Sequence, residues 1–323
     1  MATGNGAHVV HCMLERNIDD YNVIGYNPLY TLFPFALRSI LPAGEYNILH
    51  TTPDYALFFN QRKLPLVLSF QNYVLDRWIG TYSSLLQRIH YMTDLRLFTR
   101  RAIKYSVSLT AVSEFTANIV QEDLQVDRPI QVIYNSVEED VFTPQRSPKS
   151  KTNEIRVFFS GNLTKRKGAQ WLHDIAERLR SNIVIHYTQG LRTRNALPEH
   201  PKLRSIGPVP FEHMPPRYRK MDILLMPTVR EGLSLSVLEA MACGLPVVAS
   251  DCSSLPEQID KGRGGYLCTV GDVDEFAEKL NHLADSPNER KEMGQYNRWK
   301  IEKYFTVKKM VNEYKKLFET IIN

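Results

Sequence analysis

Short runs rich in β-branched and aromatic residues alternate along the chain with longer stretches that have a helical period. The alternation predicts strands at residues 21–26, 46–50, 66–70, 106–112, 130–134, 155–160, 183–187, 203–206, 223–226, 247–250 and 265–269. It predicts helices at residues 83–104, 114–123, 169–180, 235–243, 273–284, 288–304 and 307–322. Strands that alternate with helices in this way indicate parallel sheets with helices on both faces. Several of the strands are uninterrupted apolar runs, which sheets covered on both sides require.

A polar segment at residues 143–153, with two prolines and no apolar period, separates the two sets of strands. Such a composition is typical of a linker. We therefore expect an α/β protein of two Rossmann-like, doubly wound domains, 1–145 and 146–323, that face a cleft. Ligands of such sheets bind outside the carboxyl ends of the strands, so the functional residues are expected there.

Composition narrows the class of protein. Apolar residues make up 43% and charged residues 23% of the 323 residues, which is ordinary for a globular protein. No apolar run approaches the ~18 residues of a membrane-spanning helix, and the N-terminus lacks the pattern of a signal peptide. The four cysteines form no C-x-x-C pair, so we expect reduced thiols and a cytoplasmic location.

Charge is distributed unevenly between the two halves. Residues 1–150 contain 13 basic and 14 acidic residues, whereas residues 151–323 contain 27 and 21. The excess of cations suggests that the second half binds an anion, but it is too small for a nucleic-acid-binding protein. The nine histidines have no metal-binding spacing, so we expect neither a metal nor any other cofactor.

Two glycine-containing turns precede predicted helices, and each can bind an anion. One follows the strand at 155–160 and contains Gly161, Asn162 and three consecutive cations, Lys165, Arg166 and Lys167. Glycines let backbone amides approach a phosphate, and a helix N-terminus adds partial positive charge. A solvated basic turn would have the same composition. The other turn, with Gly4 and Gly6, lies so near the first residue that the strand expected before it is missing.

The segment at residues 223–251 carries the strongest signal in the sequence. A buried strand ends at Pro227, a loop carries Glu231 and Gly232, and an apolar helix that contains Glu239 begins near Ser234. A carboxylate in an apolar helix is costly unless it is paired, although Glu239 could also be an ordinary surface residue. The amides that head this helix can bind a diphosphate, and they belong to Leu233, Ser234, Leu235 and Ser236. One glutamate would then face a sugar and the other a ribose diol.

The two glutamates, with the Ala-Met-Ala-Cys-Gly-Leu-Pro-Val-Val-Ala-Ser-Asp that follows the second, resemble the signature of retaining family 4 glycosyltransferases, which have the GT-B fold. Residues 160–168 resemble that family's strand and turn before the donor phosphates, and residues 109–113 and 132–137 resemble its markers late in the first domain. The resemblance covers most of the chain. It implies metal-independent transfer of a hexose, with retention of configuration, from a nucleotide-diphosphate sugar to the hydroxyl of a glycan or lipid-linked acceptor. The implied setting is glycan, cell-envelope polysaccharide or glycolipid synthesis.

The resemblance also implies a role for each candidate residue. Glu239 would hold the ribose hydroxyls, Glu231 would contact hydroxyls of the transferred sugar, and Lys167 would neutralise charge on the leaving group. The amides of residues 233–236 would bind the diphosphate, and Gly4 and Gly6 would line it from the first domain. In the family, the last helix packs back on the first domain.

Two positions depart from the family's pattern. Asn162 stands where the family usually has an arginine and offers no charged fork, a loss for which Lys165 or Arg166 could compensate. Gln71 follows the strand at 66–70, where the family often has a histidine that faces the donor sugar. Gln71 can form hydrogen bonds but cannot carry protons at this catalytic position. These departures leave open a catalytically decayed module that only binds nucleotide sugars, and an epimerase of the same fold is a further alternative that would need its own acid–base pair.

A basic amphipathic stretch covers residues 77–104. One acid, Asp94, stands against six cations, Arg77, Arg88, Arg96, Arg100, Arg101 and Lys104. Such a helix can lie on an anionic membrane, which would place the protein at the inner face of the membrane next to a lipid-linked acceptor. A core-packed surface helix with solvated arginines would show the same pattern.

Overall fold

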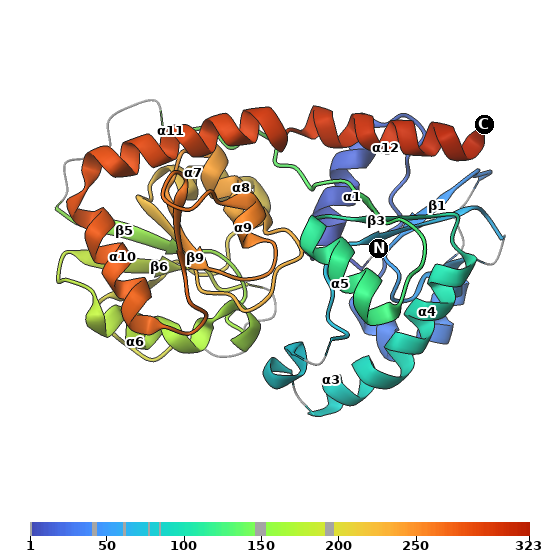
Figure 1. The fold of residues 1–323 in the computed structure, drawn as a ribbon, viewed down its shortest axis with the longest axis horizontal. Coiled ribbons are helices and arrows are strands. Elements are labelled where there is room, and N and C mark those ends of the chain that lie inside the picture. The colour runs from blue at the N-terminus through green and yellow to red at the C-terminus, as the bar shows by residue number, and fades with distance from the viewer. Residues whose placement is uncertain are drawn as a thin grey trace. The chain divides into compact units, whose positions relative to one another are not determined.

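The computed structural model describes residues 2–40, 44–60, 63–76, 78–83, 85–145, 153–190 and 197–323. The chain forms two compact units, which Figure 1 shows in colours that run along the sequence. The first unit comprises Met1–Asn135 and Val307–Asn323, and the second comprises Ser136–Thr306. Each unit is an α/β structure with its own sheet, as the alternation of strands and helices predicts.

The division between the units comes earlier in the chain than the expected boundary after residue 145. Val137 donates its N–H to the carbonyl of Phe305 (3.2 Å), and the ring of Phe142 packs on that of Tyr218, so this stretch belongs to the second unit. Residues 146–152, which form most of the predicted linker, lie outside the described residues.

The first unit has a sheet of four parallel strands in the order β1-β2-β3-β4. They are β1 (Leu49–Thr51), β2 (Leu66–Phe70), β3 (Ser108–Ala111) and β4 (Gln131–Val132). The helices of this unit are α1 (Gly6–Asn17), α2 (Ala56–Phe59), α3 (Leu85–His90), α4 (Arg96–Tyr105), α5 (Glu114–Leu124) and α12 (Val307–Ile322). Shorter helical segments are η1 (Pro28–Leu32), η2 (Pro34–Ser39) and η3 (Ile79–Tyr82), and a π-helical turn, η4 (Tyr91–Leu95), joins α3 to α4. The predicted helix at 83–104 is thus present as three consecutive segments.

The predicted strand at residues 21–26 is wrong. Among the described residues, this segment makes one isolated bridge, between Ala2 and Tyr26, and no ladder. Tyr21 instead places its hydroxyl 2.7 Å from His11 Nδ1 and 2.8 Å from His50 Nδ1. A strand needs a partner along its length, and a local run of apolar residues does not supply one.

The last helix packs on the first unit, as the resemblance implies. Tyr314 on α12 is 1% exposed, and its hydroxyl lies 3.2 Å from Ser69 Oγ on β2. Phe318 on the same helix stacks on Tyr21. These contacts explain why Val307–Asn323 belongs to the first unit although it follows the second in sequence.

The second unit has a sheet of six parallel strands in the order β10-β9-β8-β5-β6-β7. They are β5 (Ile155–Phe159), β6 (Ile183–Tyr187), β7 (Leu203–Ser205), β8 (Ile223–Met226), β9 (Val247–Ser250) and β10 (Gly265–Cys268). Its helices are α6 (Leu172–Arg178), α7 (Met214–Arg219), α8 (Leu235–Ala242), α9 (Leu255–Gln258), α10 (Val273–Asp285) and α11 (Pro287–Tyr304), with η5 (Lys165–Lys167), η6 (Ala169–Trp171) and η7 (Phe211–His213). The strand order reverses between β5 and β8, which is the place where open parallel sheets bind ligands.

Helices cover both faces of this second sheet, as Figure 1 shows. Alternate strand residues such as Val157, Ile185 and Leu225 share one buried cluster with α6 and α10. On the other face, α8 packs on α11 and α7. Double coverage explains why β8 and β9 are buried at every position and read as continuous apolar runs. In the part of the chain that the structure describes, no helix has the length and apolar character needed to cross a membrane.

Candidate functional site

The candidate site lies where β5 and β8 end, at the reversal of the strand order. The two strands are neighbours in register, with Val157 opposite Ile223, so the loops that follow them emerge together. Val229 donates its N–H to the carbonyl of Arg166 (2.9 Å), which ties the loop after β8 to the basic turn after β5. Gly168 has a φ of +80°, and a Cβ there would lie 1.9 Å from the carbonyl oxygen of Pro227. Only glycine therefore allows this close approach of the two loops.

Glu231 is the centre of this site. Its Oε1 lies 2.8 Å from Lys167 Nζ and 3.3 Å from Arg166 NH1. The hydroxyl of Thr228 donates to the same oxygen (2.8 Å), and the side chain of Glu231 is only 8% exposed. Oε1 thus forms two ion pairs and accepts a hydrogen bond from a hydroxyl. The other oxygen, Oε2, takes part in none of these three contacts.

The charges of this group keep Glu231 ionised. Burial by itself would raise the pKa of Glu231, but Lys167, Arg166 and the hydrogen bonds to its carboxylate hold the pKa below its usual value. Burial lowers the pKa of Lys167, and Glu231 opposes that effect. Lys167 and Arg166 together carry one more charge than Glu231 balances, and the remaining carboxyl whose charge acts on Lys167 is that of Glu239. Such a site favours an anionic ligand.

Glu239 lies inside α8 and is buried, with 8% exposure, so it is not a surface residue. Tyr218 on α7 donates its hydroxyl hydrogen to Glu239 Oε2 (2.7 Å). Burial raises the pKa of Glu239 to about 7, while the hydrogen bond from Tyr218 and the charge of Lys167 act in the opposite direction. Tyr218 is itself fully buried between the rings of Phe142 and Phe158, which fixes the direction of its hydroxyl. The sequence gives no local signal for this partner of Glu239.

The N-terminus of α8 follows the loop that carries Glu231 and Gly232. Ser234 is the N-cap, and Leu235 and Ser236 begin the helix. One of the four amides of residues 233–236 has a hydrogen-bond partner within the protein. The N–H of Ser234 donates to Gln258 Oε1 (2.9 Å), and Gln258 Nε2 donates back to the carbonyl of Ser234 (2.9 Å). A buried glutamine on α9 therefore occupies that amide, which no sequence pattern indicates.

A serine hydroxyl on each side of the Glu231 backbone holds the loop in place. The N–H of Glu231 donates to Ser253 Oγ (3.0 Å), and Ser254 Oγ donates to the carbonyl of Glu231 (3.3 Å). Ser253 has a φ of +50°, an uncommon conformation for a residue other than glycine. These two serines were missed by the sequence reasoning because they follow β9, which only the sheet brings next to β8.

The remaining residues of the basic turn differ in their exposure. Lys165 is exposed to solvent, whereas Arg166 is half-buried and donates from NH1 to the carbonyl of Arg230 (2.7 Å). The side chain of Asn162 packs against Gly190, where a Cβ would lie 2.2 Å from Asn162 Oδ1. Lys165 and Arg166 were the two cations expected to compensate for the arginine that Asn162 replaces. Of these two, Arg166 contacts Glu231. Gly161 begins the turn with a φ of +148°.

Three candidate residues belong to the first unit. Gly4 has a φ of +78° and precedes Asn5, whose side chain caps α1 by accepting from the N–H of His8. Gly6 is the first residue of α1. Gln71 follows β2 and accepts a hydrogen bond from Asn135 Nδ2 (2.9 Å). Their roles toward a donor remain predictions.

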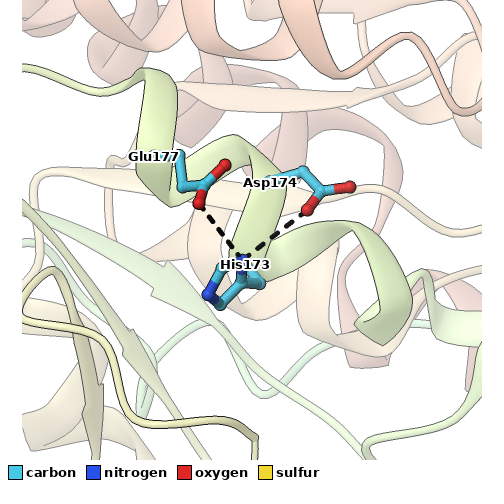
Figure 2. A group of neighbouring side chains, drawn as sticks. All are labelled: His173, Asp174 and Glu177. Atoms are coloured by element: carbon cyan, nitrogen blue, oxygen red, sulfur yellow. Dashed lines mark ion pairs between the residues drawn. The ribbon is translucent and has the colours of Figure 1, made fainter.

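A separate cluster of potential metal ligands lies on α6. Figure 2 shows His173, whose Nδ1 is 3.6 Å from Asp174 Oδ1 and 3.9 Å from Glu177 Oε1. Both carboxylates are 55% exposed. Neighbouring side chains of one surface helix commonly form such ion pairs without a metal, so the cluster gives no reason to assign a cofactor.

Two sequence families match the chain, one in each part. The family described as Glycosyltransferase Family 4 matches residues 15–141, and the family described as Glycosyl transferases group 1 matches residues 154–286. The second match includes the basic turn, Glu231 and Glu239.

Curated relatives include two proteins that align with most of the chain. An uncharacterized glycosyltransferase of Methanocaldococcus jannaschii is 27% identical over 256 residues, which are 75% of this chain and 65% of that protein. The N-acetyl-alpha-D-glucosaminyl L-malate synthase of Bacillus anthracis is 24% identical over 335 residues, 95% of this chain and 84% of that protein. A D-inositol 3-phosphate glycosyltransferase of Corynebacterium jeikeium is 37% identical over 94 residues, 29% of this chain and 22% of that protein. The chain thus spans just under two thirds of the first relative and a much smaller share of the third.

Solved structures share the whole fold at low sequence identity. Anabaena HepE, crystallised with UDP-glucose, has a TM-score of 0.79 at 16% identity and covers 99% of this chain and 98% of its own. Sucrose-phosphate synthase of Thermosynechococcus elongatus has a TM-score of 0.77 at 14% identity, over 94% of this chain and 82% of its own. Since one family match falls on each parallel-sheet unit and these structures share both units, the chain belongs to glycosyltransferase family 4 and has the GT-B fold of two Rossmann-like domains.

Proposed function

We propose that the protein transfers a hexose from a nucleotide-diphosphate sugar to an acceptor hydroxyl, with retention of configuration and without a metal. The observation that carries the proposal is the buried contact of Glu231 with Lys167 and Arg166, within electrostatic reach of the buried Glu239. The names of two relatives support sugar transfer, and the UDP-glucose bound to HepE supports a nucleotide sugar as donor.

In this proposal the two glutamates bind the two ends of the donor. Glu239 accepts hydrogen bonds from the ribose hydroxyls through Oε1, since Oε2 is bonded to Tyr218. Glu231 accepts from a hydroxyl of the transferred sugar through Oε2, since Oε1 holds the cations. The diphosphate lies at the N-terminus of α8 and the turn at Gly161, with Gly4 and Gly6 as further backbone contacts and Gln71 as a partner of the sugar.

The chemistry that we propose depends on stabilising charge at the leaving group. The acceptor oxygen bonds to the anomeric carbon on the face from which the diphosphate leaves, and a phosphate oxygen takes the acceptor's proton. Negative charge grows on the diphosphate as its bond to the sugar breaks, and preorganised cations stabilise such a transition state strongly. Lys167 and Arg166 are held by Glu231 before the donor arrives, so little reorganisation is needed.

A panel of UDP-, GDP- and ADP-sugars tests the proposal. Purified protein is incubated with each donor, with and without glycan and lipid-linked acceptors, and released nucleoside diphosphate is measured. We expect slow hydrolysis of one donor, faster turnover with an acceptor, and the α-configuration retained from an α-donor. Binding of a nucleotide sugar with no turnover under any condition would favour the decayed binding module. Inversion of configuration would refute the retaining mechanism.

We further propose a cytoplasmic protein whose first unit contacts an anionic membrane that carries the acceptor. The described cysteines, Cys12, Cys243, Cys252 and Cys268, are free, which agrees with a reducing compartment. The segments α3, η4 and α4 expose large apolar side chains, Leu85, Leu86, Ile89, Met92 and Leu97. Exposed cations accompany them, namely Arg88, Arg100, Arg101 and Lys104.

Not all six cations of the basic stretch are available for this contact. Arg96 NH1 lies 2.7 Å from Asp123 Oδ2 and is half-buried, so it stabilises the unit instead. Arg77 lies outside the described residues. Sedimentation with anionic and neutral liposomes, at low and high salt, tests the contact. We expect binding to anionic liposomes that salt weakens, whereas no binding at low salt, or binding that ignores lipid charge, would favour a soluble acceptor.

A further inference from the structure

Three side chains that follow β9 hold the backbone of the loop between Glu231 and α8. The N–H of Glu231 donates to Ser253 Oγ (3.0 Å), and Ser254 Oγ donates to the carbonyl of Glu231 (3.3 Å). The N–H of Ser234 donates to Gln258 Oε1 (2.9 Å), and Gln258 Nε2 donates to the carbonyl of Ser234 (2.9 Å). Each end of the loop thus has both its N–H and its C=O bonded to the segment after β9.

The two bonds of Gln258 meet the chain at the place where α8 begins. Ser234 is the N-cap of that helix, with an extended backbone (φ −79°, ψ 110°). Its carbonyl also accepts the N–H of Leu238 (3.1 Å), which is the first hydrogen bond of the helix. A carbonyl oxygen has two lone pairs, so α8 uses one and Gln258 uses the other. Gln258 therefore fixes the direction in which the chain enters α8.

This arrangement replaces the usual cap of a helix. An N-cap serine ordinarily accepts a hydrogen bond from the second or third amide of its helix. The side chain of Ser234 makes no such bond, and the start of α8 is held instead by Gln258, which is fully buried at the end of α9. No residue that the structure describes accepts a hydrogen bond from the N–H groups of Leu235 and Ser236. The start of α8 is thus fixed while these two amides stay available to a ligand.

We infer that Gln258 is a positioning residue for the diphosphate of the donor, because it holds the first turn of α8 in a fixed place beside Glu231. The inference rests on the proposed function, which puts the diphosphate at the N-terminus of α8, and adds Gln258, for which that function has no role. Gln258 acts through the backbone of Ser234 and not by contact with the donor. Since preorganised dipoles stabilise charge without reorganisation, loosening this turn weakens both the binding of the diphosphate and its departure.

A purely structural role is the competing explanation, and the same unit contains a matched control for it. Asn297 on α11 is also a fully buried carboxamide, and its Nδ2 donates to the carbonyls of Leu245 and Gly264 (both 2.7 Å). These carbonyls precede β9 and β10, so they lie at the amino edge of the sheet, opposite the candidate site. Asn297→Leu should therefore lower the melting temperature, because two buried carbonyls lose a partner, and leave nucleotide binding unchanged.

Two variants of Gln258 test the inference by titration calorimetry. Gln258→Met fills a similar space without hydrogen bonds, and Gln258→Asn keeps a carboxamide that is one methylene too short to hold both bonds to Ser234. The ligands are the monophosphate and the diphosphate of the nucleoside that binds best (UMP and UDP, for example). We expect both variants to lose roughly 5- to 30-fold in affinity for the diphosphate, and clearly less for the monophosphate, which keeps the ribose and lacks one phosphate.

The ratio of the two affinities decides, because a loss of stability alone does not change it. A wild-type ratio in the Gln258 variants would overturn the inference, whatever their melting temperatures. If Gln258→Met does not fold, Gln258→Asn decides alone. A ratio that falls equally in Asn297→Leu would also overturn the inference, since the effect would then come from stability. Absence of nucleotide binding by the wild-type protein would instead refute the proposed function, and the inference would fall with it.

Discussion

Removal of the Tyr218 hydroxyl tests how the protein prepares Glu239 for the nucleotide. Tyr218 is fully buried, and its ring lies 5.9 Å from that of Phe142 and 5.0 Å from that of Phe158. Phenylalanine fills the same space, so Tyr218→Phe should fold. The substitution removes the hydrogen bond to Glu239 Oε2 (2.7 Å) and, with it, the hydrogen bonds of the same hydroxyl with the side chains of Ser160 and Ser236.

The size of the effect follows from the pKa of Glu239. Burial raises that pKa to about 7, and the Tyr218 hydrogen bond restrains the rise. A hydrogen bond to a charged group contributes about 1.5–3 kcal/mol, which corresponds to a further rise in the pKa of roughly one to two pH units without it. At pH 7 the ionised fraction of Glu239 should therefore fall from about one half to about one tenth or less. Because ribose hydroxyls donate to the ionised form, nucleotide affinity should fall roughly 5- to 50-fold at this pH.

Titration calorimetry between pH 6 and pH 9, with the nucleoside diphosphate that binds best, measures this effect. Wild-type affinity should rise with pH through about 7 and then level off. The curve of Tyr218→Phe should be displaced to higher pH, so that its loss of nucleotide affinity is smaller at pH 9 than at pH 7. Glu239→Gln should bind the nucleotide weakly at every pH.

A matched control removes the same kind of bond elsewhere in the second unit. Tyr266 on β10 donates its hydroxyl hydrogen to Glu289 Oε1 (2.5 Å), and β10 is the edge strand of the sheet, two strands away from β8. Tyr266→Phe should leave the binding curve unchanged. Tyr218→Phe that binds like the wild type at pH 7, or that is weakened by the same factor at every pH, would refute the coupling of Tyr218 to Glu239.

Three further predictions concern the same unit. Lys167→Ala should lower turnover by about 10²–10³ with a smaller effect on donor affinity. Lys165→Ala, at the exposed neighbouring position, should keep the wild-type turnover. If Lys167→Ala also turned over at the wild-type rate, the role would belong to Arg166. Glu239→Gln should be more stable than the wild type above pH 7, by up to about 3 kcal/mol in denaturant melts. A carboxyl whose pKa rises from 4.5 to about 7 on folding contributes stability that is complete below pH 4.5 and is lost as pH rises through about 7, so identical stability curves would contradict the raised pKa. Turnover should persist in excess EDTA, and full loss restored by Mg²⁺ or Mn²⁺ would exclude the metal-independent mechanism.

The sequence by itself determined the elements that are set by local pattern. The strands Leu66–Phe70, Ile183–Tyr187, Ile223–Met226 and Val247–Ser250 have the predicted boundaries, because a continuous apolar run bounded by polar residues or proline has few alternatives in a sheet covered on both sides. The helix Val307–Ile322 was predicted for a similar reason, since one apolar face repeats over its whole length. Glu231 and Glu239 stand out in the sequence because a carboxylate beside a glycine-containing loop or inside an apolar helix is unusual, whereas Lys167 is singled out only by the resemblance to the family. The sequence did not predict where the first unit ends or that residues 21–26 form no strand. Both features depend on which distant partner is available.

Only the tertiary structure decided which partners these residues have. Tyr218 and Glu239 are 21 positions apart, Arg166 and Glu231 are 65 apart, and Gln71 and Asn135 are 64 apart. Arg166 and Glu231 meet because the neighbouring strands β5 and β8 end at the same edge of the sheet, whereas Tyr218 and Glu239 meet because α7 packs on α8. Gln71 and Asn135 follow β2 and β4, which lie on either side of β3 in the sheet. Local periodicity specifies that a strand exists and which residues it buries, but it contains no information on the neighbour across the sheet. The raised pKa of Glu239, the occupied amide of Ser234 and the hydrogen bond from Asn135 to Gln71 therefore follow from long-range packing.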